Sequence, residues 1–142
     1  MDLGTQPLAN NYHTGNKQQE YPLSLNLCGN CNHTQLSVAV NPELMFKHYL
    51  YVTGTSKTLR DYCGWFAKKV QAENPFCESV CDIASNDGTQ LDAFLNLGFE
   101  TTGIEPADNL IADQPHHIIN DFAENVHMTK QFDVITAQNV MA

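Results

Sequence analysis

Two short segments near the start of the chain alternate between apolar and polar residues. Their apolar positions are Leu23, Leu25 and Leu27 in the first segment and Leu36, Val38 and Val40 in the second. A period of two is typical of β-strands. Cys28-Gly29-Asn30-Cys31 lies between the two segments, so the pattern predicts a small hairpin with a cysteine-containing turn.

Helical spacing follows in two places. A short helix is expected to begin at Pro42 and to reach His48, because proline is tolerated in the first turn of a helix. A longer helix is expected from Ser56, a residue type that caps helices, to about Glu73. Its predicted apolar face consists of Leu59, Cys63, Phe66 and Val70, which recur at three- and four-residue steps.

Strand and helix patterns alternate in the second half of the chain. The expected strands cover residues 79–83, 101–104, 117–120 and 132–137, and the expected helices cover residues 91–95 and 107–112. Such alternation is typical of a parallel, doubly wound sheet. The second half of the chain is therefore expected to be an α/β domain.

Composition and charge narrow the class of protein. Hydrophobic residues make up 42% of the 142 residues and charged residues 16%, which indicates a packed core in a chain of one-domain length. The formal net charge of -9 opposes binding to nucleic acid, which depends on Lys and Arg. The start lacks the segments of a signal peptide, and no stretch is long and apolar enough to span a bilayer. We therefore expect a cytoplasmic protein with no nucleic-acid or membrane partner.

The strongest candidate for chemistry is a strand that runs into a turn of small residues and then a helix. Asp82 lies in the strand, and Ala84, Asn86 and Gly88 lie in the turn. Such a turn lets the backbone approach a ligand at the carboxyl end of the first strand of an α/β sheet. Glu105 follows at the end of the second strand, where a carboxylate can accept hydrogen bonds from both ribose hydroxyls of a nucleoside. The spacing favours a nucleoside cofactor; an ordinary βα turn with a surface glutamate is the alternative.

The chemistry of the turn distinguishes between cofactors. A dinucleotide site would contain G-x-G-x-x-G to seat a pyrophosphate, which this chain lacks, and Asp87 would repel a pyrophosphate. S-adenosylmethionine (SAM) is a cationic sulfonium without phosphates and tolerates acidic surroundings. Asp121 and Phe122 follow the third strand, where they could present a carboxylate and an aromatic wall to adenine. Core packing is the other interpretation of Phe122.

Motifs along most of the chain carry a resemblance to a known family. They are Asp2-Leu3-Gly4-Thr5-Gln6-Pro7-Leu8-Ala9-Asn10, Tyr21-Pro22-Leu23, Cys28-Gly29-Asn30-Cys31 with Gln35-Leu36, Tyr49-Leu50-Tyr51, Asp82-Ile83-Ala84-Ser85-Asn86-Asp87-Gly88, Gly103-Ile104-Glu105-Pro106-Ala107 and Asp133-Val134-Ile135-Thr136-Ala137-Gln138-Asn139-Val140. Together they resemble the motifs of the sugar C-methyltransferases. The resemblance implies an N-terminal zinc-binding module, a SAM-binding Rossmann-like domain with Pro106 as a further cofactor-site candidate, and a nucleotide-linked keto-deoxysugar as the substrate that is C-methylated.

The predicted fold is therefore α/β, with a partial Rossmann-like SAM methyltransferase domain and its parallel sheet in residues 55–142. A small zinc-knuckle-like module is expected to precede it in residues 1–54. The sequence departs from the family at Ala84, where glycine is usual, and the extra methyl group is expected near the cofactor. The family's enzymes are much longer, and their later strands and sugar-binding domain find no match here, so we expect a fragment or the product of a degenerate gene.

Cys28 and Cys31 have the spacing of metal ligands on a turn, which is typical of half a zinc knuckle. A structural zinc site needs four ligands, and the resemblance implies that the other two cysteines would precede Met1. His13 and His33 are alternative ligands, although a histidine in a polar turn is more often solvated. A thioredoxin-like redox role is less favoured, because that motif lies at the N-terminus of a helix.

Two functional hypotheses follow. In the first, the chain is a SAM-dependent C-methyltransferase in which Tyr49 and Tyr51 orient the sugar or the cofactor; packing between modules is the alternative role for both tyrosines. Because the resemblance places the general base downstream, we expect weak SAM binding and no turnover by this chain alone. In the second, the chain is a non-catalytic binding or scaffold protein that pairs through an unpaired apolar strand edge, residues 133–137, and self-associates.

Overall fold

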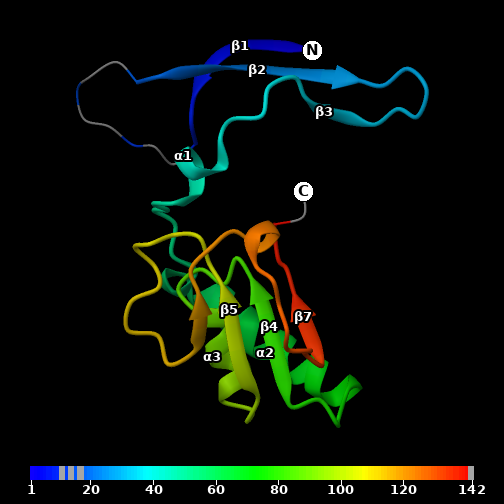
Figure 1. The fold of residues 1–142 in the computed structure, drawn as a ribbon, viewed down its shortest axis with the longest axis vertical. Coiled ribbons are helices and arrows are strands. Elements are labelled where there is room, and N and C mark those ends of the chain that lie inside the picture. The colour runs from blue at the N-terminus through cyan, green and yellow to red at the C-terminus, as the bar shows by residue number, and fades with distance from the viewer. Residues whose placement is uncertain (10–11, 13–14, 16–17, 141–142) are drawn as a thin grey trace. The chain divides into compact units, whose positions relative to one another are not determined.

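The computed structural model describes residues 1–9, 12, 15 and 18–140, which form two compact units, Met1–Leu50 and Tyr51–Ala142 (Figure 1). The first unit contains strands β1 (Asp2–Pro7), β2 (Glu20–Leu27) and β3 (Thr34–Leu36) and helix α1 (Pro42–Phe46). The second unit contains η1 (Thr53–Thr55), α2 (Lys57–Glu73), β4 (Ser79–Ile83), α3 (Thr89–Leu95), β5 (Glu100–Ile104), β6 (His117–Ile119), η2 (Ala123–Asn125) and β7 (Val134–Thr136).

The first unit is an antiparallel sheet of order β1-β2-β3. The predicted hairpin is confirmed: Leu25 pairs with Leu36, and the turn between the strands closes when the Cys28 N–H donates to the His33 carbonyl at 2.8 Å. The second strand is shorter than expected, because it ends at Leu36. Val38 and Val40 lie beyond it and continue the apolar alternation without pairing in the described sheet.

The sequence pattern missed strand β1. All six of its residues are exposed, and its composition is polar, so no apolar alternation marks it. Main-chain pairing with β2 holds it instead, with Gln6 opposite Tyr21. The register shifts between Asp2 and Thr5, where Gly4 adopts a left-handed φ of 74°, as in a β-bulge.

Helix α1 begins at Pro42 as predicted, with the Asn41 side chain capping it by accepting from the Glu43 N–H. It ends at Phe46, so His48 lies outside it. The described residues of Met1–Leu50 include no buried side chain. Main-chain hydrogen bonds rather than an apolar core therefore hold this unit.

The second unit is built on a four-stranded sheet of order β6-β5-β4-β7, in which every pair is parallel. The sheet and its helices confirm the predicted partial Rossmann-like fold. Strand order reverses between β4 and β7, because β5 and β6 lie on one side of β4 and β7 on the other (Figure 1). Ligands of open α/β sheets bind outside the carboxyl ends of the strands at such a switch point.

Helix α3 packs on β4 and β5, and α2 packs on α3, so that both helices lie behind the sheet in Figure 1. The Ser56 hydroxyl accepts from the Leu59 N–H and caps α2 as predicted. The buried core consists of Ala67, Val80, Leu91, Phe94 and Phe99. Within this core the rings of Phe94 and Phe99 pack edge to face, with their centroids 5.2 Å apart.

The expected helix over residues 107–112 is absent; the described chain there makes turns. A single main-chain hydrogen bond from the Leu110 N–H to the Ala107 carbonyl closes one turn. Asp108 and Asn109 follow Ala107, and such side chains compete with helical hydrogen bonds. Asp113 then adopts a left-handed φ of 60°, which reverses the chain toward β6.

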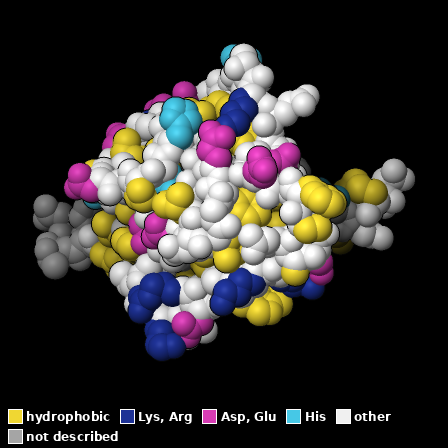
Figure 2. All heavy atoms as spheres, turned by 90° about the horizontal axis from the view of Figure 1, so that it is seen from below, with side chains coloured by type: hydrophobic (Ala, Val, Ile, Leu, Met, Phe, Trp, Pro, Cys, Tyr) yellow, Lys and Arg dark blue, Asp and Glu magenta, His cyan; other side chains and the backbone are white. Residues whose placement is uncertain are grey.

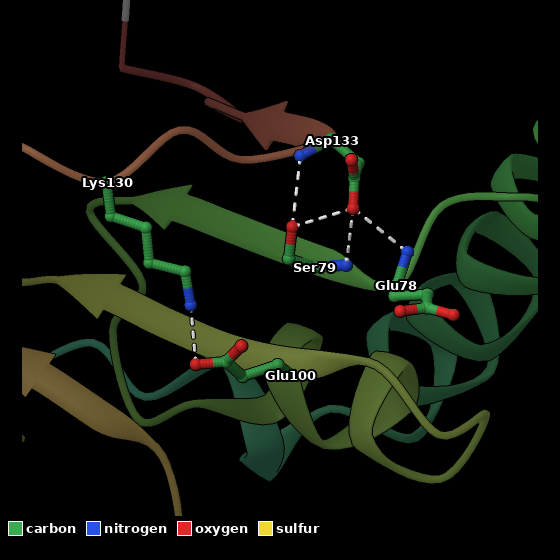
Figure 3. A network of polar contacts seen from close by, with 5 residues as sticks. All are labelled: Glu78, Ser79, Glu100, Lys130 and Asp133. Carbon is green, nitrogen blue, oxygen red and sulfur yellow. Dashed lines mark hydrogen bonds and ion pairs between the residues drawn. The ribbon is translucent and has the colours of Figure 1, made fainter.

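Strand β7 begins after Asp133, whose carboxylate ties the amino ends of β4 and β7 together (Figure 3). Its Oδ2 accepts from the Glu78 N–H at 3.0 Å, the Ser79 N–H at 3.0 Å and the Ser79 hydroxyl at 2.8 Å. The Glu78 amide and then the Ser79 hydroxyl lower the pKa of Asp133 below its ordinary value. Lys130 pairs with Glu100 and fixes the preceding segment to β5.

On the face drawn in Figure 2, acidic, basic and hydrophobic side chains are interspersed. None of the helices in the described part of the chain has both the length and the apolar character that crossing a bilayer requires.

Candidate functional site

The turn between β4 and α3 has an unusual backbone. Ala84, Asn86 and Gly88 all have left-handed φ values, of 57°, 53° and 79°. Only glycine adopts this conformation without steric cost, so the surroundings must hold Ala84 and Asn86 in place. Strained backbone of this kind concentrates at ligand sites. The predicted site turn thus has two non-glycine residues at left-handed φ within three positions.

Gly88 is required by space as well as by φ. A Cβ atom at this position would lie 2.5 Å from Gln114 Oε1 and 2.9 Å from His116 Cδ2. Gly88 also precedes the first residue of α3, so a larger residue here would disturb both the start of the helix and the loop of residues 114–116.

Asp82 is buried at the carboxyl half of β4. The Thr136 hydroxyl of β7 donates to its Oδ1 at 2.6 Å. Burial raises the pKa of Asp82 to about 6, the Thr136 hydrogen bond opposes that rise, and the nearby Glu105 charge adds to it. Sequence analysis missed Thr136 as a partner because it lies within an apolar strand pattern and only the three-dimensional pairing of β4 with β7 reveals it.

Glu105 lies at the end of β5 and is 4% exposed. Its Oε2 accepts from the Asn86 N–H at 2.7 Å, and its Oε1 accepts from the Ala107 N–H at 2.9 Å. Burial raises the pKa of Glu105, and these two amides oppose the rise. An ionised carboxylate can accept about four hydrogen bonds, so the two protein donors leave acceptor capacity for a ligand.

Asn120, Asp121 and Phe122 follow β6 at the same edge of the sheet as Glu105. Asn120 Nδ2 donates to the Glu105 carbonyl at 2.9 Å, and Asp121 Oδ1 accepts from the Phe122 N–H at 2.7 Å. Asp121 and Phe122 are half-buried, as is Pro106 directly after Glu105. The structure thus brings the candidate residues of β4, β5 and β6 to one edge of the sheet.

A feature that sequence analysis missed is the contact between this turn and the segment Tyr51–Thr55. The Thr53 N–H donates to Asn86 Oδ1 at 2.9 Å, and the Gly54 N–H donates to Asp87 Oδ2 at 2.8 Å. Asn86 Nδ2 donates to the Tyr51 carbonyl at 3.0 Å. No sequence pattern links residues more than thirty positions apart, which is why this contact was not predicted.

The two candidate tyrosines have different surroundings. Tyr51 belongs to the second unit, and its side chain is 44% exposed. Tyr49 belongs to the first unit, where its ring lies 6.1 Å from the Phe46 ring, centroid to centroid.

An open groove of about 630 Å³ lies beside the carboxyl end of β7. Its lining residues are Leu59, Tyr62 and Phe66 of α2 and Ile135, Thr136, Ala137, Gln138 and Asn139. Thr136 connects this groove to the buried carboxylate of Asp82. None of the candidate cofactor residues, Asp82 included, lines the groove.

Cys28 and Cys31 are exposed on the hairpin turn of the first unit. Hydrogen bonds from the Cys31 and then the Asn30 backbone lower the pKa of Cys28, which favours the thiolate that binds metals. The described residues contain no group of three or more metal-binding side chains, so these two cysteines alone do not fit a four-ligand zinc site. His33 lies in the same turn, and His13 lies outside the described residues.

The site and fold can be compared with known proteins. Residues 1–46 match a family model described as "Putative zinc binding domain". The C-methyltransferase NovU of Streptomyces niveus is 26% identical over 121 residues, with 78% of this chain and 28% of NovU covered. The predicted resemblance is confirmed.

Solved structures show the same fold as the second unit's sheet and helices. Streptomyces venezuelae DesVI has a TM-score of 0.50 at 18% identity, over 59% of this chain and 38% of its own. SAM-bound CalS10, an amino pentose methyltransferase from Micromonospora echinaspora, has a TM-score of 0.51 at 18% identity, over 63% of this chain and 43% of its own. The chain spans less than half the length of NovU, DesVI or CalS10.

We predict that Asp82→Asn stabilises the chain near neutral pH. The raised pKa means that the protonated carboxyl favours folding; this contribution is present below the ordinary value of 3.8 and is lost as the pH rises through about 6. The neutral amide avoids that loss, so the advantage of the variant should grow between pH 4 and pH 7, by up to about 3 kcal/mol. Urea unfolding of both proteins across this range measures it.

Asp61→Asn is the matched control, because Asp61 is an exposed partner of Lys57 and should show a small, nearly pH-independent effect. An advantage of Asp82→Asn that is the same at pH 4 and pH 7 would contradict the prediction.

Proposed function

We propose that this chain is part of a SAM-dependent methyltransferase and that the turn 84–88 with Glu105 forms its cofactor site. The observation that carries the proposal is the left-handed turn at the carboxyl end of β4. The buried Glu105 carboxylate stabilises this turn by accepting from the Asn86 N–H. The likeness to NovU and the fold shared with SAM-bound CalS10 support it. The acidic surroundings of Asp82, Asp87 and Glu105 suit a cation and disfavour a phosphate.

Different residues of the site would bind different parts of the cofactor. Glu105 accepts hydrogen bonds from the ribose hydroxyls with its remaining acceptor capacity, Asp121 and Phe122 contact the adenine, and the backbone of residues 84–88 faces the methionine portion. When bound, SAM supplies an electrophilic methyl group. The Ala84 methyl group lies on the exposed side of the turn, so it narrows the approach to the backbone and weakens binding relative to glycine.

For the acceptor we propose a sugar, and within that class a nucleotide-linked keto-deoxysugar. The name of CalS10 identifies an amino pentose methyltransferase, and NovU is named a C-methyltransferase. The Tyr51 phenol would orient the sugar, and the same role for Tyr49 of the first unit stays a prediction. A carbon next to a ketone loses its proton to a general base before methylation, and we assign no described residue to that base.

The SAM proposal predicts that isothermal titration of the chain with SAM gives a measurable heat, and that Glu105→Gln weakens binding at least about tenfold, because one charge-assisted acceptor is lost. Glutamine keeps the shape of the side chain and one acceptor, so the turn retains partial support. Glu100→Gln is the control, since Glu100 lies at the other end of β5 and pairs with Lys130. Equal affinity of wild type and Glu105→Gln would remove Glu105 from the site.

We further propose that Cys28 and Cys31 supply two of the ligands of a zinc site in the first unit. The match of residues 1–46 to a zinc-binding family and the exposed cysteine pair support it. A unit whose described residues bury no side chain also gains most from a metal, because small units without a core depend on such cross-links.

We predict that zinc slows amide hydrogen exchange in residues 20–36 of the chain, and that Cys28→Ser with Cys31→Ser abolishes the effect. Two thiolates make a weak site, so the zinc should be removed by a mild chelator. Cys77→Ser controls for loss of a thiol elsewhere. Equal zinc-dependent protection in the double variant would exclude this pair as ligands.

A second candidate function is a binding or scaffold role through the edge of β7. Among the described strands β7 pairs only with β4, and Ile135 is 64% exposed. Unpaired apolar edges recruit further strands.

This candidate predicts concentration-dependent self-association in light scattering, reduced by Ile135→Lys, because a charge on an edge strand opposes pairing. Leu95→Lys is the control; Leu95 is a 40% exposed residue of α3, away from the edge. A monodisperse monomer over a wide concentration range would contradict the prediction.

A further inference from the structure

Asn86 uses every polar group it has to join three parts of the second unit. Its N–H donates to Glu105 Oε2 at 2.7 Å, and its carbonyl accepts from Gln114 Nε2 at 3.1 Å. Its side-chain Oδ1 accepts from the Thr53 N–H, and its Nδ2 donates to the Tyr51 carbonyl. The cofactor turn, the loop after β5 and the segment Tyr51–Thr55 therefore meet at one residue.

The conformation of Asn86 indicates that its side chain matters. Its φ of 53° is left-handed, and glycine would adopt this φ without cost. Asparagine tolerates the conformation better than most residues, and its short side-chain amide can accept from one backbone group and donate to another. The turn alone does not require that amide. The segment Tyr51–Thr55 forms hydrogen bonds with both its oxygen and its nitrogen.

A second, parallel contact fixes the same segment. The Gly54 N–H donates to Asp87 Oδ2 at 2.8 Å, and a Cβ atom at Gly54 would lie 2.6 Å from that oxygen. Gly54 is thus the residue that lets the chain approach the turn so closely. Its amide reports on the position of the segment, although its partner is Asp87 and not Asn86.

We propose that Asn86 is a positioning residue that couples the Glu105 carboxylate to the segment Tyr51–Thr55 and, through the Tyr51 backbone, to the Tyr51 phenol. The ligand side of this coupling rests on the proposed function, in which Glu105 holds the ribose. Ribose hydroxyls that share Glu105 Oε2 change the hydrogen bond to the Asn86 N–H. A shift of Asn86 alters the hydrogen bonds of its side chain to Thr53 and Tyr51. An occupied cofactor site therefore restrains Tyr51.

The coupling can be tested without any ligand. In Glu105→Gln one of the two backbone amides, of Asn86 or of Ala107, loses its acceptor, and hydrogen exchange at the Gly54 amide should accelerate at least about fivefold. In Asn86→Gly, which keeps the left-handed φ and removes the side chain, adding Glu105→Gln should produce no further acceleration at Gly54. Equal acceleration by Glu105→Gln with and without the Asn86 side chain would overturn the proposal.

Two further variants separate positioning from general loss of structure. Asn86→Asp keeps an acceptor for the Thr53 N–H and loses the donor to Tyr51, so its Gly54 exchange should fall between wild type and Asn86→Gly. Asn74→Ala removes an amide-to-carbonyl hydrogen bond to Val70 at the end of α2 and should leave Gly54 unchanged. If Asn74→Ala accelerated Gly54 as much as Asn86→Gly, the effect would be global instability and the proposal would fail.

The same amide then reports on SAM. Saturating SAM should slow Gly54 exchange at least about fivefold in wild type and not in Asn86→Gly. A wild-type chain that gives no heat with SAM would contradict the proposed function, and the ligand-free comparison would still decide the coupling. SAM that binds and slows Gly54 equally in both proteins would overturn the coupling alone.

Discussion

The second unit depends on one buried carboxylate. Glu105 directly follows β5, and its two carboxylate oxygens accept from the Asn86 amide on the turn after β4 and from the Ala107 amide on its own loop. A charge-assisted hydrogen bond to a backbone amide is roughly twice as strong as a neutral one. The turn between β4 and α3 therefore keeps a conformation that its sequence alone, with Ala84 and Asn86 at left-handed φ, would not favour.

The rest of the site follows from that fixed turn. Because Asn86 is held, its side chain can reach the segment Tyr51–Thr55, and Asp87 next to it holds the Gly54 amide. Gly88, which precedes the first residue of α3, packs so closely against Gln114 and His116 that a Cβ atom would not fit there. The segment before α2 and the loop after β5 thus both contact the five-residue turn 84–88.

How much the sequence predicts depends on whether a feature is local. Strand β4, the cap of α2 at Ser56 and the turn after Asp82 all have patterns within a few residues, and the structure agrees with them. Strand β1 was not predicted, because its six residues are exposed and carry no apolar alternation, and pairing with β2 holds it. The Thr136 bond to Asp82 joins residues 54 positions apart; no local periodicity reports such a contact. The helix expected over residues 107–112 does not form, because Asp and Asn side chains compete with helical hydrogen bonds and Asp113 reverses the chain at a left-handed φ.

The two buried carboxylates are costly to a chain that only has to fold. Asp82 lies in β4 and Glu105 directly follows its neighbour β5. Burial raises the pKa of both, and the charge of Glu105 raises that of Asp82 further. The described partners of the two carboxyl groups are the Thr136 hydroxyl and backbone amides, which donate hydrogen bonds and carry no net charge. A cation at the carboxyl edge of β4 and β5 would relieve the repulsion and lower both pKa values toward ordinary ones. The electrostatic cost in the free chain is therefore the physical reason to expect a positively charged ligand at this edge of the sheet.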